Sequence, residues 1–434
     1  MTEEKRLPVI QVALDFLELD RAVSCAREAA AGGAARLEAG TPLIKSEGLN
    51  AVRRLRAEFP DRTIVADLKT MDAGRIEMEA AAKAGAKIAV VLGAASESTI
   101  RECVEVGRNY GIEVAVDVLG AADAVARAKE AQAWGASEVW VHVPIDDQMR
   151  GREAFETLRE VAGAVSVPVA VAGGLHPGNV VEAAAAGADV LIVGGAITKS
   201  VDAQEATRAV LNALRTGKAE ATHLYRRGGE GDIRSILEKV SAANLSDALH
   251  RGGVAEGLRP LAPGTRLVGT AVTVRTVAGD WAKPVEAIDV ASSGDVLVVD
   301  AGGRPPAVWG ELATTSALGR GLAGLVVDGA VRDTADVRAS GFAVFTRHVS
   351  PNAGEPKGLG EIGAPVTVGG QRVLPGDWIL GDDDGVVVLP RDRAVEYANR
   401  AMDVLERENR IRAEIRAGST LSKVVELLRW EKRG

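Results

Sequence analysis

The 434-residue sequence predicts an α/β protein made of a closed (β/α)8 barrel followed by a second, mixed α/β domain. Short β-branched runs alternate with Ala-rich helical stretches through the first half and recur about every 25 residues, a spacing that accommodates one strand and one helix. Eight such units in roughly 200 residues are typical of a (β/α)8 barrel. After residue 216 the strands lie closer together and are separated by Gly-Gly and Pro-Gly turns, which favours antiparallel pairing.

The first domain is predicted from eight apolar runs that are continuous rather than alternating. Continuous runs are typical of strands that are covered on both faces, as in a parallel sheet. Phrases such as AAKAGAKIAVVLG place a Gly where a helix ends before the next strand. The domain is predicted to span residues 1–214. The runs lie at residues 8–14, 35–39, 63–68, 86–92, 112–118, 138–143, 167–172 and 189–194.

Residues 215–231 are polar and Gly-rich without an apolar period, so they are interpreted as a linker. The second domain is predicted to span residues 232–434. A helix is expected over residues 232–249, and charged helical segments are expected over residues 391–431. The expected strands lie at residues 265–277, 294–303, 323–333, 342–349, 364–380 and 384–390.

The composition argues against several classes of partner. A net charge of −8 gives no support to a nucleic-acid interface. No apolar run approaches the roughly 20 residues of a membrane helix, and the N-terminus lacks the apolar core of a signal peptide. Cys25 and Cys103 stand in Ala- and Val-rich stretches and are interpreted as buried thiols in a reducing compartment. A cytoplasmic protein is therefore expected.

Charged residues stand where the first three apolar runs end. Catalytic groups of a parallel barrel collect at this end of the strands. Asp67 and Lys69 are two residues apart and share a face, where they would meet Asp15 and Glu38 of the neighbouring strands. Glu38 and Asp67 are hard oxygen ligands suited to Mg²⁺, and Lys69 would balance Asp15 and Asp72. The alternatives are a helix N-cap for any single Asp and a structural ion-pair network at the rim.

The later strand ends carry polar residues and glycines. Paired glycines after the seventh and eighth strands favour a phosphate site, because backbone N–H groups of these loops bind phosphate in many barrels. A single strand-end His is more often structural than catalytic. The residues concerned are Asp117 on the fifth run, His142 on the sixth with Asp146 and Gln148 beyond it, then Gly173, Gly174, Gly194 and Gly195.

Several motifs together resemble the 3-hexulose-6-phosphate synthase family of the orotidine-phosphate decarboxylase superfamily. The D-x-K-x-x-D signature of that superfamily stands in ADLKTMDAG (66–74). The resemblance covers roughly residues 8–212. The other motifs are ALD (13–15), LEAGTPLIKSEG (37–48), VHVPIDDQ (141–148), VAGG and VGGAIT.

This resemblance implies a lyase of formaldehyde fixation, as in the ribulose monophosphate pathway. Formaldehyde would condense reversibly with the enediolate of D-ribulose 5-phosphate to give D-arabino-hex-3-ulose 6-phosphate, with Mg²⁺ (or Mn²⁺) as cofactor. Glu38 and Asp67 would hold the metal, and Lys69 would stabilise the enediolate or move protons. Asp72 would reach across a dimer interface. The remaining implied site residues are Asp15 and His142 as catalytic groups, with Asp146, Gln148 and the paired glycines as substrate contacts.

The 3-keto-L-gulonate-6-phosphate decarboxylases are the alternative for the barrel, because they share the metal site and the signature. The stretch HVPIDDQ (142–148) favours the synthase, since synthases carry an Ile-Asp-x-Gln segment after this His. The Val-Pro pair within it departs from the more common pair of small residues.

In the second half, the candidate substrate- and metal-binding residues lie within residues 310–347. Gly310, Glu311 and Leu312 open a helix whose N-terminal N–H groups could bind a carboxylate. Arg332 and Asp333 follow a strand, where Arg332 could bind a keto-acid carboxylate and Asp333 a divalent metal. A surface ion pair is the alternative for Arg332. The dipeptide at 328–329, Asp-Gly, is interpreted as a turn.

Residues 232–431 resemble the RraA-like family, which includes ribonuclease E regulators and class II 4-hydroxy-4-methyl-2-oxoglutarate aldolases. The resemblance implies that Arg332 serves a pyruvate enolate and Asp333 a divalent metal, expected to be Mg²⁺. The backbone of Gly310–Leu312 would contact substrate, and Glu311 would stand near a metal-bound water. A metal-dependent aldolase or oxaloacetate decarboxylase is expected, and a non-catalytic ribonuclease-binding regulator is the alternative. Both resemblances imply a homo-oligomer.

Overall fold

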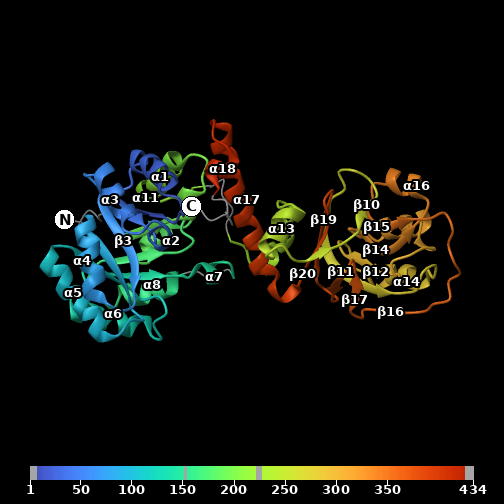
Figure 1. Cartoon of the computed structure of the whole chain (residues 1–434). Coiled ribbons are helices and arrows are strands. Elements are labelled where there is room, and N and C mark those ends of the chain that lie inside the picture. Colours follow the sequence, from blue (N-terminus) through green and yellow to red (C-terminus); the bar gives the residue numbers. More distant parts are fainter. Residues whose placement is uncertain (1–6, 151–153, 221–226, 426–434) are drawn as a thin grey trace, which may run out of the picture. The chain divides into compact units, whose positions relative to one another are not determined.

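The computed structural model describes residues 7–150, 154–220 and 227–425, which form two compact units (Figure 1). The first unit holds residues up to Gln148, the described residues of the range 152–227, and those from Glu406 on. The second unit holds the described residues of 149–151 and the range Gly228–Leu405. No helix in the described parts of the chain is both long and apolar enough to cross a membrane.

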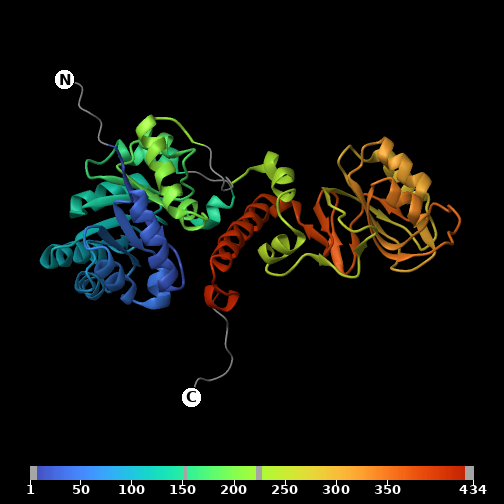
Figure 2. The ribbon, with the colours of Figure 1, turned by 90° about the horizontal axis from the view of Figure 1, so that it is seen from above.

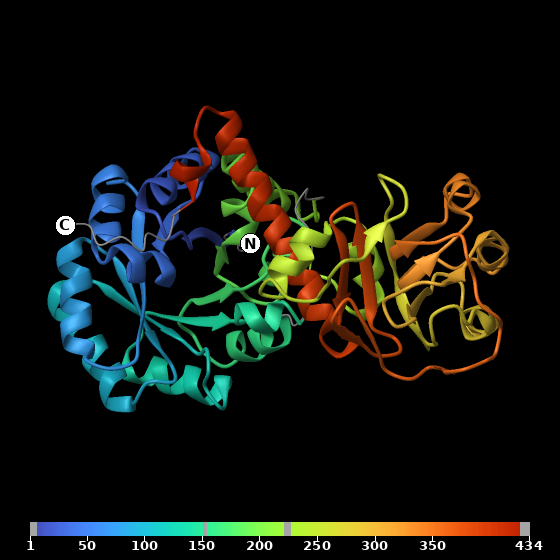
Figure 3. The same ribbon diagram turned by 45° about the vertical axis from the view of Figure 1, so that its right-hand side comes forward.

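The first unit is a closed barrel of eight parallel strands in the order β1 to β8, as predicted. Helices surround the strands (Figures 1 and 3). Small and branched apolar side chains fill both the barrel interior and the layer between strands and helices. The strands are β1 (Val9–Leu14), β2 (Arg36–Ala39), β3 (Thr63–Thr70), β4 (Ile88–Leu92), β5 (Glu113–Asp117), β6 (Glu138–His142), β7 (Val169–Ala172) and β8 (Val190–Val193).

The helices of the barrel end at the glycines that the repeated phrases predicted. Gly33, Gly85 and Gly135 each follow a helix with φ near 100°, and the N–H of each contacts carbonyls of the last turn. Only glycine adopts this conformation without strain. The helices are α1 (Leu19–Gly32), α2 (Thr41–Glu47), α3 (Asn50–Glu58), α4 (Gly74–Ala84), α5 (Glu97–Tyr110), α6 (Ala124–Trp134), α7 (Ile145–Gln148), α8 (Phe155–Ala162), α9 (Val180–Ala185), α10 (Gly195–Thr198) and α11 (Ala203–Thr216).

The second unit is built on a mixed sheet in the order β10-β15-β14-β12-β11-β19-β20-β9, with β13 beside β14 and β16 beside β11. Its centre is parallel, and β19 and β20 are antiparallel. The strands are β9 (Val254–Ala255), β10 (Arg259–Pro260), β11 (Leu267–Arg275), β12 (Val296–Asp300), β13 (Ala307–Trp309), β14 (Gly324–Val331), β15 (Ala343–Val349), β16 (Glu361–Ile362), β19 (Trp378–Asp382) and β20 (Gly385–Leu389), and a separate hairpin joins β17 (Val366–Val368) to β18 (Gln371–Val373).

Three helices, α14 to α16, pack on one face of this sheet, and the β17–β18 hairpin packs on the other (Figure 2). This places an apolar layer on each side of the central parallel strands, whose residues are accordingly buried. The helices of the second half are α12 (Ile233–Leu237), α13 (Ala242–Ala248), α14 (Ala282–Val290), α15 (Glu311–Gly319), α16 (Thr334–Ala339), α17 (Ala394–Arg416) and α18 (Leu421–Val424).

Two local predictions are corrected. The single helix expected over residues 232–249 is two helices, because the Ser241 hydroxyl accepts a hydrogen bond from the Asn244 N–H at 3.0 Å and starts α13. The dipeptide Asp328-Gly329 is not a turn but part of β14, which is paired on both sides. The predicted linker overlaps the end of α11 at Thr216, and its residues 221–226 lie outside the described ranges, as do residues 426–431 of the expected C-terminal helix.

Candidate functional site

The predicted charged residues meet at the carboxyl end of the barrel strands. Glu38 lies on β2 opposite Ala13 of β1, and Asp15 directly follows β1. Asp67 and Lys69 lie near the end of β3, where the pairing with β4 shifts register. Lys69 has φ of 47°, a left-handed conformation that is unusual for a side chain of this size. The strand is therefore irregular where its charges stand, and such strain is common at functional sites.

Lys69 joins two carboxylates from non-adjacent strands. Its Nζ lies 3.1 Å from Asp67 Oδ2 and 3.1 Å from Asp117 Oδ2, the latter on β5. Of the two carboxylates that Lys69 is predicted to balance, its charge acts on Asp15, whereas Asp72 lies exposed beyond β3, where its Oδ1 accepts the Ala73 N–H at 2.7 Å. Burial lowers the pKa of Lys69, but the charges of Asp67 and Asp117 outweigh it and raise the pKa well above its usual range. The ammonium is therefore fully protonated.

Asp117 was noted at the end of the fifth apolar run, but the sequence prediction gave it no role in the site. Its side chain is fully buried, and its Oδ2 lies 3.1 Å from both Lys69 Nζ and His142 Nδ1. Its Oδ1 accepts the Leu119 N–H at 3.0 Å. Burial raises the pKa of Asp117, but the hydrogen bond and charge of His142, the charge of Lys69 and the Leu119 N–H outweigh it, so the pKa lies below its ordinary value. With Nδ1 of His142 donating to this carboxylate, Nε2 is the nitrogen left to exchange a proton.

Glu38 is buried beside the side-chain amide of Gln11. Its Oε2 accepts a hydrogen bond from Gln11 Nε2 at 2.7 Å, and Gln11 is a second residue that the prediction missed. Burial, together with the charges of Asp67 and Asp15, raises the pKa of Glu38 well above its ordinary value. Burial and the charge of Asp67 also raise the pKa of Asp15. The site therefore concentrates negative charge that Lys69 alone does not neutralise.

The loop after β2 fixes two of these carboxylates. Thr41 Oγ1 donates to Asp67 Oδ2 at 2.8 Å and lies 2.9 Å from the Asp67 carbonyl oxygen. A Cβ atom on Gly40 would overlap Asp15 Oδ1, so only glycine allows this loop to pass so close. Both residues belong to the LEAGTPLIKSEG motif, but neither was singled out as functional from the sequence.

Glu38 and Asp67 fit a divalent cation in their chemistry. No three His, Cys, Asp or Glu side chains within the described ranges form a metal-binding group by themselves. Mg²⁺ commonly takes only one or two carboxylates and completes its shell with water and substrate oxygens. The raised pKa values of Asp15 and Glu38 mark a place where a bound cation would relieve charge repulsion. The metal remains a prediction.

The glycines after β7 approach β6 closely. Gly173 and Gly174 have φ of 106° and 69°, and a Cβ atom on Gly173 would lie 2.8 Å from the Val143 carbonyl oxygen. The same carbonyl accepts a hydrogen bond from Gln148 Nε2 at 2.8 Å. Gln148 thus lies at the carboxyl end of the barrel, as predicted, and Asp146 lies on the same short helix, α7.

The glycines after β8 lie next to the charged cluster. Gly194 precedes α10, and a Cβ atom on it would lie 3.8 Å from Asp15 Oδ2. A Cβ atom on Gly195 would lie 3.4 Å from Lys199 Nζ, and the charge of Lys199 acts on Asp15. Backbone N–H groups, a lysine and the carboxylate cluster therefore occur together, an arrangement able to hold both ends of a small anionic substrate.

The residues predicted for the second site also come together. Asp333 Oδ2 lies 3.5 Å from Arg332 Nε and accepts the Glu311 N–H at 3.1 Å. A Cβ atom on Gly310 would lie 2.5 Å from the same oxygen, so glycine permits the start of α15 to approach Asp333. Asp333 has φ of 53°, which makes it, after Lys69, the second non-glycine residue among the predicted site residues in a left-handed conformation. Leu312 is 80% exposed beside this cluster.

On β14, Asp328 forms an ion pair with Arg347 of β15, at 2.5 Å between Oδ1 and Nε. Asp328 Oδ2 accepts the Gly369 N–H at 2.7 Å, and Arg347 Nη2 donates to the Glu256 carbonyl at 3.0 Å. Burial raises the pKa of Asp328, but the bonds from Arg347 and Gly369 outweigh it and lower the pKa. These bonds join β14 and β15 to two loops, so the pair is structural.

The two halves match two different families. Residues 8–210 match the orotidine 5'-phosphate decarboxylase / HUMPS family, and residues 242–388 match the RraA-like family, described as Aldolase/RraA. The 3-hexulose-6-phosphate synthase of Methylomonas aminofaciens is 40% identical over 197 residues, which cover 45% of this chain and 94% of the synthase. That of Mycobacterium gastri is 36% identical over 205 residues, which cover 47% and 99%. These relatives are hardly longer than the barrel.

A solved structure matches the second half. The RNA-processing inhibitor RraA from Thermus thermophilis is 32% identical, with a TM-score of 0.33, and the match covers 35% of this chain and 93% of that protein.

Proposed function

The chain belongs to the orotidine 5'-phosphate decarboxylase / HUMPS family through its barrel and to the RraA-like family through its second half, and we propose that the barrel is a formaldehyde-fixing aldolase. It would condense formaldehyde with D-ribulose 5-phosphate to give D-arabino-hex-3-ulose 6-phosphate, reversibly. The observation that carries the proposal is the arrangement of Lys69 and His142 on the Asp117 carboxylate, beside Asp15, Glu38 and Asp67.

The reaction needs a base, an oxyanion partner and an acid. His142 Nε2 would remove a proton from C1 of the sugar phosphate, next to the C2 carbonyl, because Asp117 binds Nδ1. The protonated Lys69 would stabilise the negative charge that develops on the enediolate oxygens. C1 would then form a bond to the carbon of formaldehyde, whose oxygen would take up a proton from the site. Asp15 lies where it could position the reacting hydroxyls.

Glu38 and Asp67 would hold Mg²⁺ or Mn²⁺. Such a cation, when bound, would supply positive charge opposite the oxygens that become negative during proton removal. Gln11 and Thr41 would hold these carboxylates in place through the hydrogen bonds at 2.7 and 2.8 Å.

The rest of the substrate would extend across the barrel end. Backbone N–H groups at Gly174, Gly194 and Gly195, with Lys199, would bind the phosphate. Asp146 and Gln148 would contact the sugar from α7. Asp72, which is exposed beyond β3, would complete the site of a partner subunit in a homo-oligomer.

The test is a product assay on the full chain. Formaldehyde, ribulose 5-phosphate and Mg²⁺ are incubated with the protein, and hexulose 6-phosphate is followed by mass spectrometry. We expect product that disappears with EDTA and in Asp67→Ala, whereas Asp61→Ala, an exposed change before the same strand, keeps it. A folded, metal-loaded protein that gives no product would overturn the synthase proposal and favour a 3-keto-L-gulonate-6-phosphate decarboxylase.

For the second half we propose a metal-dependent lyase that acts through a pyruvate enolate, as an aldolase or an oxaloacetate decarboxylase. The supporting observation is that Arg332, Asp333 and the N–H of Glu311 converge within 3.5 Å. Arg332 would bind the keto-acid carboxylate, and Asp333 would hold a divalent cation, expected to be Mg²⁺. Glu311, held by Thr315 Oγ1 at 2.8 Å, would act on a nearby water.

Pyruvate release from oxaloacetate tests this second proposal. We expect Mg²⁺-dependent release that Asp333→Ala removes and that Asp336→Ala, an exposed change three residues further on in α16, retains. No release by the folded chain, together with inhibition of a ribonuclease, would instead indicate a regulator.

A further inference from the structure

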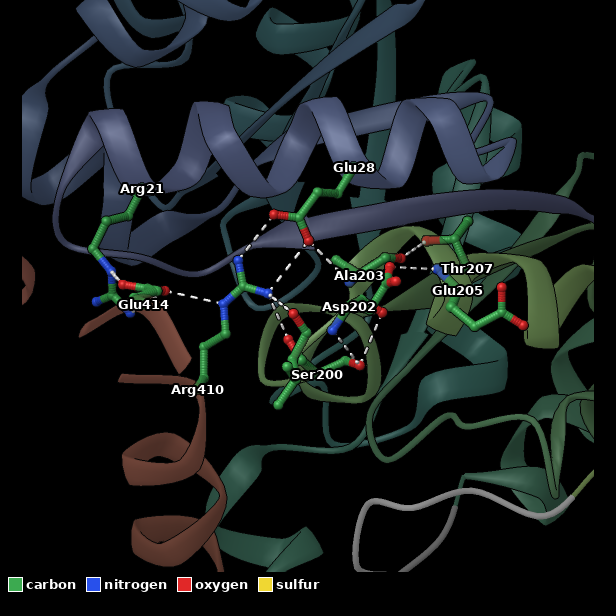
Figure 4. A network of polar contacts seen from close by, with 10 residues as sticks. Arg21, Glu28, Ser200, Asp202, Ala203, Glu205, Thr207, Arg410 and Glu414 are labelled. Atoms are coloured by element: carbon green, nitrogen blue, oxygen red, sulfur yellow. Dashed lines mark hydrogen bonds and ion pairs between the residues drawn. The ribbon is translucent and has the colours of Figure 1, made fainter. Parts of the chain in front are cut away.

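An arginine from the C-terminal part of the chain fixes the loop after β8. Arg410 lies in the last turns of α17, which group with the barrel unit. Its Nη1 donates to the carbonyl oxygens of Ser200 and Val201 at 2.7 and 2.8 Å. Figure 4 shows the guanidinium lying between this loop and the carboxylate of Glu28 on α1.

All nitrogen atoms of this guanidinium have partners. Nη2 lies 3.0 Å from Glu28 Oε1, and Nε lies 3.0 Å from Glu414 Oε1. Glu414 is in turn held by Arg21 of α1 at 3.1 and 3.2 Å (Figure 4). Arg410 is only 8% exposed. A buried arginine with planar, many-bonded contacts fixes geometry more strongly than a surface ion pair.

The loop that Arg410 holds continues into the proposed phosphate segment. The Ser200 N–H donates to the Ile197 carbonyl at 3.1 Å, which ties Ser200 to α10. The helix α10 begins at Gly195, and the N–H groups of Thr198 and Lys199 donate to the Gly194 and Gly195 carbonyls. A displacement of Ser200 therefore carries Gly194 and Gly195 with it.

On the other side the same loop is tied to α1. The Ala203 N–H donates to Glu28 Oε2 at 2.9 Å, so Glu28 holds both Arg410 and the start of α11. Removing the guanidinium would leave the carbonyl oxygens of Ser200 and Val201 without their donor, and the loop would have to rearrange to find one.

We propose that Arg410 is a positioning residue for the barrel reaction, holding the Gly194–Lys199 segment in the conformation that binds the substrate phosphate. The inference rests on the proposed function, because the phosphate is that of the proposed substrate. It also means that residues following the second domain complete the barrel. The family match of the barrel ends at residue 210, and the barrel-sized synthase relatives have no room for such a segment.

The test measures phosphate affinity apart from catalysis. Inorganic phosphate is titrated calorimetrically into the full chain, and a Gly195→Asp variant, which adds a repelling carboxylate, identifies the binding event of the barrel. In Arg410→Ala we expect the affinity at this site to fall by on the order of tenfold, the effect of a small misplacement of binding groups. The KM for ribulose 5-phosphate should rise by a similar factor, while kcat stays within about twofold.

Arg412→Ala is the matched control, because Arg412 is on the same helix, is half-exposed, and pairs with Glu408. Unchanged phosphate affinity and KM in a folded Arg410→Ala protein would overturn the proposal and leave Arg410 a purely structural role. If Arg410→Ala does not fold, Arg410→Gln is measured in the same way, and full affinity there overturns it equally. If the wild-type chain makes no hexulose phosphate, the synthase function fails, but the phosphate affinities still decide the role of Arg410.

Discussion

The Asp117 carboxylate holds His142 and Lys69 of the barrel site together. It contacts Lys69 and His142 through one oxygen, and its own side chain is fully buried. Removing one partner of a buried ion pair typically costs about 3–5 kcal/mol, because the remaining charge stays in the interior. The orientation of His142 therefore depends on the Asp117 carboxylate.

Asp117→Asn should reduce kcat of the aldol reaction by about 10²–10⁴-fold, the range of general acid–base contributions. The amide keeps the shape but no longer offers a charged acceptor to both Lys69 and His142. Steady-state kinetics on the purified variant check this, with Asp123→Asn as control, because Asp123 only caps α6 and Asn caps equally well. Near wild-type kcat in Asp117→Asn would show that His142 is not the base.

The stability of the same variant should depend on pH in a defined direction. The folded-state pKa of Asp117 is below its ordinary value, so its contribution to stability is fully present above the unfolded pKa of about 3.9. That contribution is lost as pH falls through the lower, folded pKa. The difference in free energy of unfolding between wild type and Asp117→Asn should therefore shrink only below about pH 4. Denaturant titrations between neutral and acidic pH measure it, and a difference that shrinks already above pH 5 would contradict it.

Glu38→Gln should stabilise the metal-free barrel at neutral pH while removing activity. Burial and two neighbouring carboxylates raise the pKa of Glu38 in the folded state. The contribution of Glu38 to the free energy of unfolding therefore falls as the pH rises from the pKa of the unfolded state through that of the folded state. At neutral pH, above its unfolded pKa, Glu38 therefore costs stability, whereas a neutral amide at this position has no charge to bury and keeps the bond to Gln11. In EDTA we expect a gain on the order of 1 kcal/mol.

Denaturant unfolding checks this gain, with the exposed Glu102→Gln as control. Adding Mg²⁺ should stabilise the wild type and leave Glu38→Gln unchanged, since a ligand stabilises only the state that binds it. If Glu38→Gln is instead less stable than the wild type in EDTA, the charge of Glu38 is already compensated by other groups in the metal-free protein.

The individual charges of this site could be predicted, but not all of their partners. Asp15, Glu38, Asp67 and Lys69 stand at strand ends, and parallel strands bring their ends together. Lys69 pairs with Asp117 across the barrel, between β3 and β5, which are not adjacent, so no local pattern indicates the contact.

At the level of elements, the connection between β3 and α4 is strained. Ala73, which precedes α4, has φ of 55° and is exposed. A left-handed conformation costs a non-glycine residue about 1–2 kcal/mol. The signature motif thus keeps an unfavourable backbone beside Lys69 and Asp72, where the predicted catalytic groups stand.

Ala73→Gly should raise the free energy of unfolding of the barrel by up to about 1 kcal/mol, because glycine adopts this conformation freely. The same substitution at Ala126, an exposed position inside α6, should instead lower it by about 0.5–1 kcal/mol. Thermal unfolding of both variants makes the comparison, and equal destabilisation by both would mean that Ala73 is not strained in solution.

Most elements were predictable because their pattern is local. The eight barrel strands are continuous apolar runs, and burial on both faces demands just that composition. The errors arose where tertiary pairing overrides a local signal. Asp328-Gly329 is a turn dipeptide in isolation, yet Asp328 pairs with Asp300 of β12, and β14 resumes its pairing with β15 at Ala330 after a register shift.

Over the whole molecule, sequence order does not fully match the compact units. The predicted second domain ran to the end of the chain, but the described residues from Glu406 on group with the barrel. A charged helical pattern does not specify its partner, and Arg410 contacts Glu28 across 382 positions of sequence. Only the folded structure reveals this pairing.

The two proposed activities should respond independently to mutation. The barrel residues and the Arg332–Asp333 group lie in separate units, each with its own apolar core. Asp67→Ala should lower hexulose phosphate formation by at least about 100-fold and leave pyruvate release within about twofold of wild type, since the proposed metal site of the barrel serves only the barrel reaction. Asp333→Ala should do the reverse.

Both reactions are measured on the same purified preparations, together with the unfolding midpoint of each variant. A double variant should lose both activities. The loss of each activity should equal the loss caused by the single change in the same site. If Asp333→Ala instead slowed the barrel reaction with unchanged unfolding, the sites would be energetically coupled. In that case the effect must be reciprocal for binding, so ligand affinity at the second site should change when ribulose 5-phosphate occupies the first.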